Sequence, residues 1–323
     1  MTTPPPAEWA HHAAVWIGFP SHRDLWGADL EPARREVAAF ANAVDADGKG
    51  ETVILVAADN EAAAAAHALA PFAELLVEDF GDIWLRDTGP ILLGDGCARD
   101  FDFNGWGGKY DLPGDDTVGA RLASSRGINA ASCNWVLEGG AIDGDGSGTV
   151  ITTEQCLLNH NRNPGLQRTE IETRLAEDLG LTRVVWLGEG LLNDHTDGHV
   201  DNLARFVGEG RVAIPEQTEN DPNWQVYQHA RRDAEAAGLE VVTIPSPGRV
   251  LRDEEIVPAS YMNFYIGNAA VVVPLYGAVN DDAAVAAIQA LFPGREAIGL
   301  RADSILSGGG SFHCISQQIP GRP

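Results

Sequence analysis

The sequence feature that most constrains the fold is a helix-then-strand unit that recurs five times along the chain. Helix start signals stand near residues 59, 116, 168, 222 and 281, so that successive starts are 57, 52, 54 and 59 residues apart. A strand-like apolar run begins 16 to 19 residues after each start, near Leu75, Asn134, Val184, Val241 and Ala297. Self-similarity at such a period indicates repeated supersecondary modules, and five modules of this kind can close radially around an axis.

Capping residues set the expected bounds of these helices. Asp59 is expected to cap the first helix, Thr169 and Glu172 to form a capping box, and Asp221 with Pro222 to open the fourth helix. The five expected helices cover residues 60–70, 117–126, 170–179, 223–237 and 282–292. A sixth helix, over 31–46, extends the first module on its N-terminal side. Three glycines suit left-handed helix ends: Gly127, Gly180 and Gly238.

A doubly wound parallel sheet would also alternate helix and strand. However, no G-x-G-x-x-G motif follows an early strand, and the polar motifs are spread over several modules rather than confined to one crevice. We therefore expect an α/β fold of five radially arranged blades. No low-complexity linker divides the chain, so residues 1–323 are expected to form a single catalytic domain of five pseudo-repeated modules.

The charge of the chain excludes some partners. The formal net charge is −25, with 47 Asp and Glu against 22 Lys and Arg, and the only lysines are Lys49 and Lys109. Such a field repels nucleic acid and anionic lipid and attracts small cations into a cleft. Salt adaptation or codon bias explains the same excess, so charge permits a cationic substrate without identifying one.

The N-terminal segment and the cysteines indicate a cytoplasmic protein. Residues 1–16 lack a basic region followed by an apolar run, as a signal peptide requires, and no stretch approaches the ~20 apolar residues that span a bilayer. The four cysteines show no C-x-x-C spacing and are expected to be reduced thiols: Cys97, Cys133, Cys156 and Cys314.

Polar residues and glycines cluster just beyond four of the five strand-like runs. These clusters cover residues 82–90, 138–140, 194–202 and 308–314. In a radial fold, equivalent strand ends converge on the axis, so the four clusters are expected to meet at one site.

The types of residue in these clusters suit chemistry on a guanidinium group. Cys314, after three glycines, is a candidate nucleophile, and its thiolate would need a neighbouring cation because a free cysteine has a pKa near ~8.5. His199 is the candidate acid and base. Asp87 and Asp201 can each accept two N–H bonds from a planar guanidinium. Glu138 is expected to orient His199 or to take a further N–H.

Each of these residues also has an ordinary structural explanation. A single cysteine is usually a small core residue, a single histidine is usually a satisfied buried one, and Asp87 beside Arg86 could form a local ion pair. His195, His199 and Asp201 have the spacing of a metal site, but Gly198 makes a helix there doubtful, so we expect no metal.

At these same residues the sequence resembles the agmatine deiminase family, which is related to bacterial peptidylarginine deiminases. The resemblance runs nearly from end to end. Its segments are Glu8-Trp9, 16–20, 83–90, 103–109, 137–140, 157–164, 196–202, 258–264 and the Cys314 segment.

The resemblance implies a five-bladed, pentein-like α/β propeller that modifies guanidines without a metal or organic cofactor. It implies hydrolysis of agmatine to N-carbamoylputrescine and ammonia through a thiouronium on Cys314, on the route to putrescine and other polyamines. It also implies that His199 protonates the departing ammonia and activates water, that Asp87 and Asp201 hold the guanidinium, and that Glu138 supports the site. Trp84 and Trp106 are candidates for packing the substrate's methylene chain.

Three departures from the family pattern weaken the choice of agmatine itself. They are residues 9–12, which read Trp-Ala-His-His, His195 in place of an acidic residue, and Ser311-Phe312 in place of Asn-Ile. We expect these positions to line the pocket for the substrate's tail. Free arginine or another guanidino compound is therefore an alternative substrate. An amidinotransferase, a metallohydrolase and a non-enzymatic polyamine-binding protein are alternatives of other classes, and a homo-oligomer is compatible with the sequence.

Overall fold

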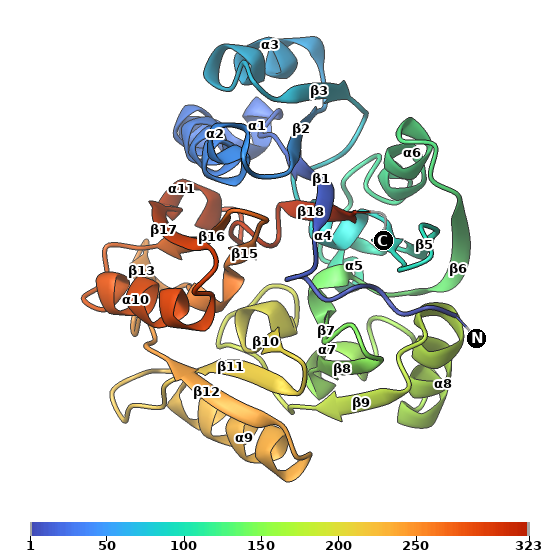
Figure 1. Cartoon of the computed structure of the whole chain (residues 1–323), viewed down its shortest axis with the longest axis vertical. Coiled ribbons are helices and arrows are strands. Elements are labelled where there is room, and N and C mark those ends of the chain that lie inside the picture. Colours follow the sequence, from blue (N-terminus) through green and yellow to red (C-terminus); the bar gives the residue numbers. More distant parts are fainter. Residues whose placement is uncertain (1, 322–323) are drawn as a thin grey trace.

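Five small sheets surround a common centre in the computed structural model, which describes residues 2–321 (Figure 1). Four sheets have three strands each, in the orders β4-β5-β6, β7-β8-β9, β10-β11-β12 and β15-β16-β17. The remaining sheet has the order β18-β1-β2-β3, so the last strand of the fold pairs with the first. The predicted arrangement of five modules is therefore present. The predicted single domain 1–323 includes Met1, Arg322 and Pro323, which lie outside the described residues, and it stays a prediction.

The strand bounds follow chain order. In the first two sheets they are β1 (His12–Gly18), β2 (Thr52–Ala57), β3 (Glu74–Val77), β4 (Ile91–Leu92), β5 (Ala98–Asp102) and β6 (Ala130–Val136). In the third and fourth they are β7 (Ile142–Gly144), β8 (Thr149–Thr152), β9 (Arg183–Trp186), β10 (Arg205–Gly208), β11 (Arg211–Pro215) and β12 (Glu240–Ile244). The last are β15 (Tyr265–Ile266), β16 (Ala270–Leu275), β17 (Glu296–Arg301) and β18 (Ser316–Pro320).

Each module repeats one topology for a physical reason. In the four three-stranded sheets the first two strands pair antiparallel and follow each other closely, whereas the last two strands pair parallel. In the four-stranded sheet the antiparallel pair joins β18 to β1, and β1, β2 and β3 pair parallel. Parallel neighbours need a crossover, and a helix supplies it in every module. These five helices are α3 (Asn60–Leu69), α6 (Val118–Ser125), α8 (Arg168–Leu179), α9 (Trp224–Ala236) and α10 (Asp281–Leu291). They lie at the periphery in Figure 1, so the loops at the inner strand ends are free to build a site.

The predicted helices and strands are confirmed, with small shifts at their ends. The additional helix, α2 (Leu30–Asp45), matches the predicted 31–46. Four of the five predicted strand starts differ from the observed ones by one residue, but β6 begins four residues before Asn134. Residues 130–133 are small, and Ala131 and Ser132 are exposed, so the segment lacks the apolar signal of a strand, and its pairing with β5 decides its conformation. The three predicted glycine helix ends all have positive φ: Gly127, Gly180 and Gly238.

Two predicted caps were wrong. The capping box of α8 joins Gln167 and Glu170 rather than Thr169 and Glu172, because the helix begins at Arg168. Asp221 is not the cap of α9. Its side chain accepts hydrogen bonds from the Asn223 amide and the Ser246 hydroxyl, so it ties the turn before the helix to a distant loop. Asp59 does cap α3, accepting from the Ala62 amide at 2.8 Å.

A two-stranded hairpin stands outside the five modules and was not predicted. Its strands are β13 (Leu251–Arg252) and β14 (Glu255–Ile256), joined by Asp253 and Glu254. Both turn residues have positive φ, 48° and 67°, which is uncommon for residues other than glycine. The guanidinium of Arg252 holds the hairpin to the rest of the molecule through the carboxylate of Asp29 and the carbonyl of Asp303.

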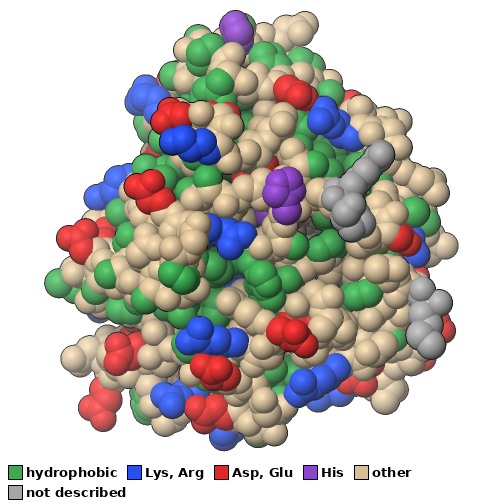
Figure 2. All heavy atoms as spheres, viewed as in Figure 1, with side chains coloured by type: hydrophobic (Ala, Val, Ile, Leu, Met, Phe, Trp, Pro, Cys, Tyr) green, Lys and Arg blue, Asp and Glu red, His purple; other side chains and the backbone are tan. Residues whose placement is uncertain are grey.

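On the face seen in Figure 2, acidic and basic side chains are interspersed over the modules. Within residues 2–321, no helix has both the length and the apolar character needed to cross a membrane. The four cysteines form no disulfide in this part of the chain.

Candidate active site

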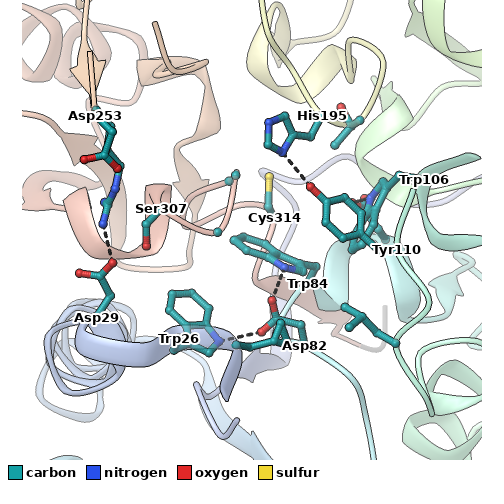
Figure 3. A pocket seen from close by; sticks show the side chains of 18 residues that line it. Trp26, Asp29, Asp82, Trp84, Trp106, Tyr110, His195, Asp253, Ser307 and Cys314 are labelled. Atoms are coloured by element: carbon teal, nitrogen blue, oxygen red, sulfur yellow. Dashed lines mark hydrogen bonds and ion pairs between the residues drawn. The ribbon is translucent and has the colours of Figure 1, made fainter. Parts of the chain in front are cut away.

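A cavity of about 420 Å³ contains four of the residues predicted for the site. Cys314, Asp87, Trp84 and Trp106 all line it, and Figure 3 shows Cys314 next to the Trp84 indole. The residues come from three modules. The convergence expected of a radial fold therefore does bring these clusters together.

Cys314 lies on the turn between α11 (Asp303–Leu306) and β18, and the glycines before it leave room for its side chain beside Trp84. A Cβ at Gly308 would lie 2.5 Å from the Trp84 ring, and one at Gly310 would lie 3.0 Å from Cys314 Sγ. The Asn263 amide donates to Sγ at 3.0 Å, and the thiol donates to Asp201 Oδ2 at 3.4 Å. Burial, together with the charges of Asp201 and Asp87, raises the pKa of the Cys314 thiol well above its ordinary value. The resting sulfur is therefore a protonated thiol.

Asp201, on the short turn η4 (Val200–Asn202), has two carboxylate oxygens in different surroundings. Oδ2 accepts from His313 Nδ1 at 2.8 Å and from the Cys314 thiol. Oδ1 is buried and has no hydrogen-bond partner within the described residues. Burial by itself raises the pKa of Asp201, but the hydrogen bond and charge of His313, with His199 and Arg205, bring the pKa below its ordinary value.

Asp87 lies on the single-turn helix α4 (Leu85–Thr88), where its carboxylate accepts from two donors. Trp106 Nε1 donates to Oδ2 at 2.9 Å, and the Gly140 amide donates to Oδ1 at 2.9 Å. The backbone of Trp106 has a φ of 52°, and the glycines on both sides of it also have positive φ. This backbone conformation brings the indole to the Asp87 carboxylate. Burial raises the pKa of Asp87, and the attraction of His199 partly offsets this effect.

His199, Asp87 and Asp201 meet around Gly140. A Cβ on that glycine would lie 2.7 Å from His199 Nδ1, 2.8 Å from Asp87 Oδ1 and 3.1 Å from Asp201 Oδ2. His199 is fully buried, and neither ring nitrogen has a hydrogen-bond partner in the described part of the chain. Burial lowers the pKa of His199, but Asp87, 3.6 Å from Nδ1, with Cys156 and Glu138 raises it well above the ordinary value. His199 is thus a proton donor in the resting site.

Glu138 lies deeper than the cavity wall. Its Oε1 accepts from Arg162 Nε at 2.6 Å, and its Oε2 is buried without a partner in residues 2–321. Glu138, Cys156 and His199 have donor atoms within 4.8 Å of one another and could in principle hold a metal ion. The guanidinium of Arg162 already neutralises Glu138, however, so the donor set suits a divalent cation poorly. The metal set considered from the sequence does not form, because His195 is exposed at the cavity rim while His199 is buried.

The indoles of Trp84 and Trp106, both predicted for the site, are held by different carboxylates. Trp84 Nε1 donates to Asp82 Oδ2 at 2.7 Å, and Trp26 donates to the other oxygen at 2.9 Å. The rings of Trp26 and Trp84 stack with centroids 6.4 Å apart, so this buried carboxylate fixes an aromatic wall of the cavity (Figure 3). Trp106 forms the opposite wall, with Tyr110 edge-on to it.

Of the three departures from the family pattern, only His195 lines the cavity. Its Nδ1 lies 2.9 Å from the Tyr110 hydroxyl. The expectation was wrong for the other two. Phe312 is fully buried and stacks on Phe40 of α2 at 4.8 Å, and His12 is buried beside Glu51. Both therefore belong to the core behind the site.

No role was predicted for Asn263, His313, Asp82 or Trp26, although Asp82 and His313 lie within the polar clusters 82–90 and 308–314. Asn263 lies within one of the segments that carry the family resemblance, and His313 directly precedes Cys314. That proximity was the available signal, since neither residue stands out by its type or its spacing.

Comparison with known proteins agrees with this geometry. A family model, the Porphyromonas-type peptidyl-arginine deiminase, matches residues 5–320. The agmatine deiminase of Stutzerimonas stutzeri (strain A1501) is 38% identical over 351 residues, which cover 98% of this chain and 95% of that protein.

Two solved structures are similar over nearly their whole length. The agmatine deiminase of Enterococcus faecalis has a TM-score of 0.91 at 30% identity, covering 99% of this chain and 96% of that one. A cysteine-to-serine variant of C. jejuni agmatine deiminase with substrate bound has a TM-score of 0.93 at 30% identity, covering 100% and 97%. These similarities confirm the predicted pentein-like α/β fold. The chain belongs to the Porphyromonas-type peptidyl-arginine deiminase family.

Proposed function

We propose that this protein is an agmatine deiminase, which hydrolyses agmatine to N-carbamoylputrescine and ammonia through a covalent intermediate on Cys314. The observation that carries the proposal is a nucleophilic thiol in a cavity with carboxylates on its inner wall. Cys314 and Asp87 line the cavity, and Asp201 accepts the thiol's hydrogen bond. The full-length similarity to agmatine deiminases points to the same reaction.

Unpaired buried atoms at the inner end support guanidinium binding. Asp201 Oδ1 and Glu138 Oε2 have no partners within the described residues, and each such buried polar atom costs roughly 1–3 kcal/mol. A planar guanidinium carries N–H donors in the fork geometry that carboxylates accept. Its charge would also neutralise Asp87 and Asp201, so a guanidinium is the ligand these groups suit best.

The same charge would activate the nucleophile. The pKa of Cys314 is raised by burial and by nearby carboxylates, so a thiolate forms there only with a cation beside it. We propose that the substrate guanidinium is that cation. As it enters, the thiol proton leaves to water in the cavity, and Cys314 Sγ attacks the guanidinium carbon to form a C–S bond.

His199 would then act as acid and as base. Its raised pKa keeps it protonated, so it gives its proton to the departing nitrogen, the C–N bond breaks, and ammonia leaves a thiouronium on Cys314. The neutral imidazole next takes a proton from water while the hydroxide adds to the same carbon. Breaking the C–S bond releases the carbamoyl product, and the proton of its new hydroxyl passes to the sulfur and restores the resting thiol. Asp87 and Asp201 hold the remaining nitrogens throughout.

The outer part of the cavity favours an ammonium tail over a carboxylate tail. Asp29, Asp82 and Asp253 line the cavity with one arginine, Arg252, which pairs with Asp29, so the lining carries more acidic than basic groups. The indoles of Trp84 and Trp106 are placed to pack the methylene chain between the two ends. Agmatine ends in an ammonium group, whereas free arginine adds a carboxylate that would meet this acidic wall.

We further propose a cytoplasmic role in polyamine biosynthesis, because the product becomes putrescine once its carbamoyl group is removed. The partner is then a small cationic substrate rather than nucleic acid or a membrane. Self-association stays a prediction, to be measured by light scattering during size-exclusion chromatography.

The decisive test is ammonia release from agmatine, free arginine and a peptidyl-arginine, compared by kcat/KM. We expect agmatine to give the largest value by at least about tenfold. Turnover of arginine above agmatine would assign the alternative substrate, and no turnover of any of the three would refute the proposal. Running the reaction in ¹⁸O-labelled water tests hydrolysis against amidino transfer, because hydrolysis places the label in the carbamoyl oxygen.

A further inference from the structure

A second buried histidine lies directly behind the proposed nucleophile, and the mechanism above does not use it. His313 is 1% exposed and precedes Cys314. Its Nδ1 lies 2.8 Å from Asp201 Oδ2, and its Nε2 lies 2.8 Å from Glu8 Oε1. The ring thus connects the N-terminal segment to a carboxylate of the site.

The His313 ring forms a hydrogen bond with each of these two carboxylates. An ionised carboxylate only accepts, so each 2.8 Å contact requires an N–H from the ring. Burial raises the pKa of Glu8, but Arg205, His313 and Arg86 bring it well below its ordinary value. The pKa of Asp201 is also lowered, as described above. The ring thus holds one carboxylate at each of its nitrogens.

The hydrogen bond with His313 makes the two carboxylate oxygens of Asp201 differ. His313 and the Cys314 thiol both bond to Oδ2, so Oδ1 is the oxygen that remains without a partner in residues 2–321. Asp87 Oδ1 and Asp201 Oδ2 both lie beside Gly140, 2.8 and 3.1 Å from where its Cβ would be, so the two carboxylates repel each other. Without a donor on Oδ2, Asp201 would be free to rotate or to take a proton.

We propose that His313 is a positioning residue for deimination, which keeps Asp201 ionised and turned so that Oδ1 meets the substrate guanidinium. Glu8 anchors the ring from behind, and Arg205 and Arg86 hold Glu8 in turn. The inference rests on the proposed function, because it assigns Asp201 to guanidinium binding.

Two substitutions separate the two contacts of the ring. Asn at this position carries its amide nitrogen about where Nδ1 lies, and Gln carries its amide nitrogen about where Nε2 lies. His313→Asn therefore keeps a donor for Asp201, and His313→Gln keeps a donor for Glu8 alone. We expect kcat/KM for agmatine to fall roughly 10- to 100-fold in His313→Gln, mainly through KM, and several-fold less in His313→Asn.

The pH profile supplies the readout that a merely structural residue would not move. Removing the donor raises the pKa of Asp201, so Asp201 takes a proton at a higher pH. The acid limb of kcat/KM should accordingly move to higher pH in His313→Gln and less in His313→Asn. Equal losses in the two variants, with an unmoved acid limb, would overturn the proposal.

The wild-type protein separates this inference from the proposed function. If wild type does not hydrolyse agmatine, the function fails before any variant is compared. If it does, the variants test His313 alone. Should His313→Gln not fold by circular dichroism, Glu8→Gln replaces it, because it removes the anchoring charge and leaves His313 in place. That variant should move the acid limb in the same direction by a smaller amount, and an unmoved limb there also refutes the proposal.

Discussion

The two ends of the cavity differ in burial, and burial decides what a charge can do there. At the inner end, Cys314 is 5% exposed and Asp201 is fully buried. At the outer end, Asp253 is exposed on a hairpin tip, and the Asp29–Arg252 pair is partly open to solvent. Charges in water are screened and contribute little, whereas charges out of water shift one another's pKa values strongly.

The comparison suggests that the inner end performs the chemistry and the outer end chooses among substrates. Inner groups are held by several bonds each, as Asp87 is by Trp106 and Gly140. The outer end is built partly by the β13–β14 hairpin, which lies outside the five modules. The predictions below test this division, from the largest expected effect to the smallest.

Cys314→Ala should abolish turnover of agmatine while the ligand still binds, because the carboxylates of the inner end remain. Ammonia release and calorimetric binding measure the two properties separately. Cys133→Ala is the matched control, since it removes another buried thiol that does not line the cavity. Residual multiple turnover in Cys314→Ala would contradict the nucleophile assignment.

His199→Ala should lower kcat by ~10²–10⁴-fold, the usual contribution of a general acid and base. His195→Ala, a histidine only four residues away at the exposed rim, should change kcat much less. Steady-state kinetics of both variants test the contrast between the two ends. Similar losses in the two would mean that burial does not divide the cavity as described.

Asp87→Asn should shift the alkaline limb of kcat to lower pH. The pKa of His199 is raised mainly by the charge of Asp87, so the protonated imidazole persists to high pH and is lost as pH rises through that raised value. Removing the charge lowers the pKa, and His199 loses its proton earlier. We also expect kcat/KM to fall roughly 10- to 100-fold as a charge-assisted hydrogen bond is lost. An alkaline limb in its wild-type place would refute the coupling of Asp87 to His199.

Asp253→Asn should raise KM for agmatine only a few-fold, because exposed charge pairs contribute ~0.2–1 kcal/mol and are screened by salt. Butylguanidine, which lacks the ammonium group, should show no change. Glu254→Gln is the control, since it lies on the same turn but does not line the cavity. A fall in kcat with both substrates would place Asp253 in the chemistry instead of the tail site.

The modules could be predicted from sequence because local signals define them. Asp59 caps its helix by a short-range hydrogen bond, and Gly180 ends another with a φ of 67°. The hairpin around Asp253 could not be predicted, since its strands have two residues each and its turn lacks the Asn-Gly or Gly residues that favour positive φ. Arg252 holds it from outside, through contacts with distant residues.

In the site, residue types could be predicted better than contacts. Cys314 and Asp87 stood out by chemistry, and both do line the cavity. Phe312 was expected near the substrate tail, but its ring turns into the core against Phe40. The direction in which a side chain points depends on packing between distant segments, and a single sequence contains no local signal for it.

The pairing of β18 with β1 has a consequence for when the newly synthesised chain can fold its active site. The register joins Ile17 to Ser316, only two residues after Cys314. A ribosome must therefore pass residue 316 before the sulfur can take its place among its carboxylates. In the proposed mechanism, chains that stop short of Cys314 would carry Asp87 and Asp201 yet lack the nucleophile, so activity would appear only once β18 joins β1.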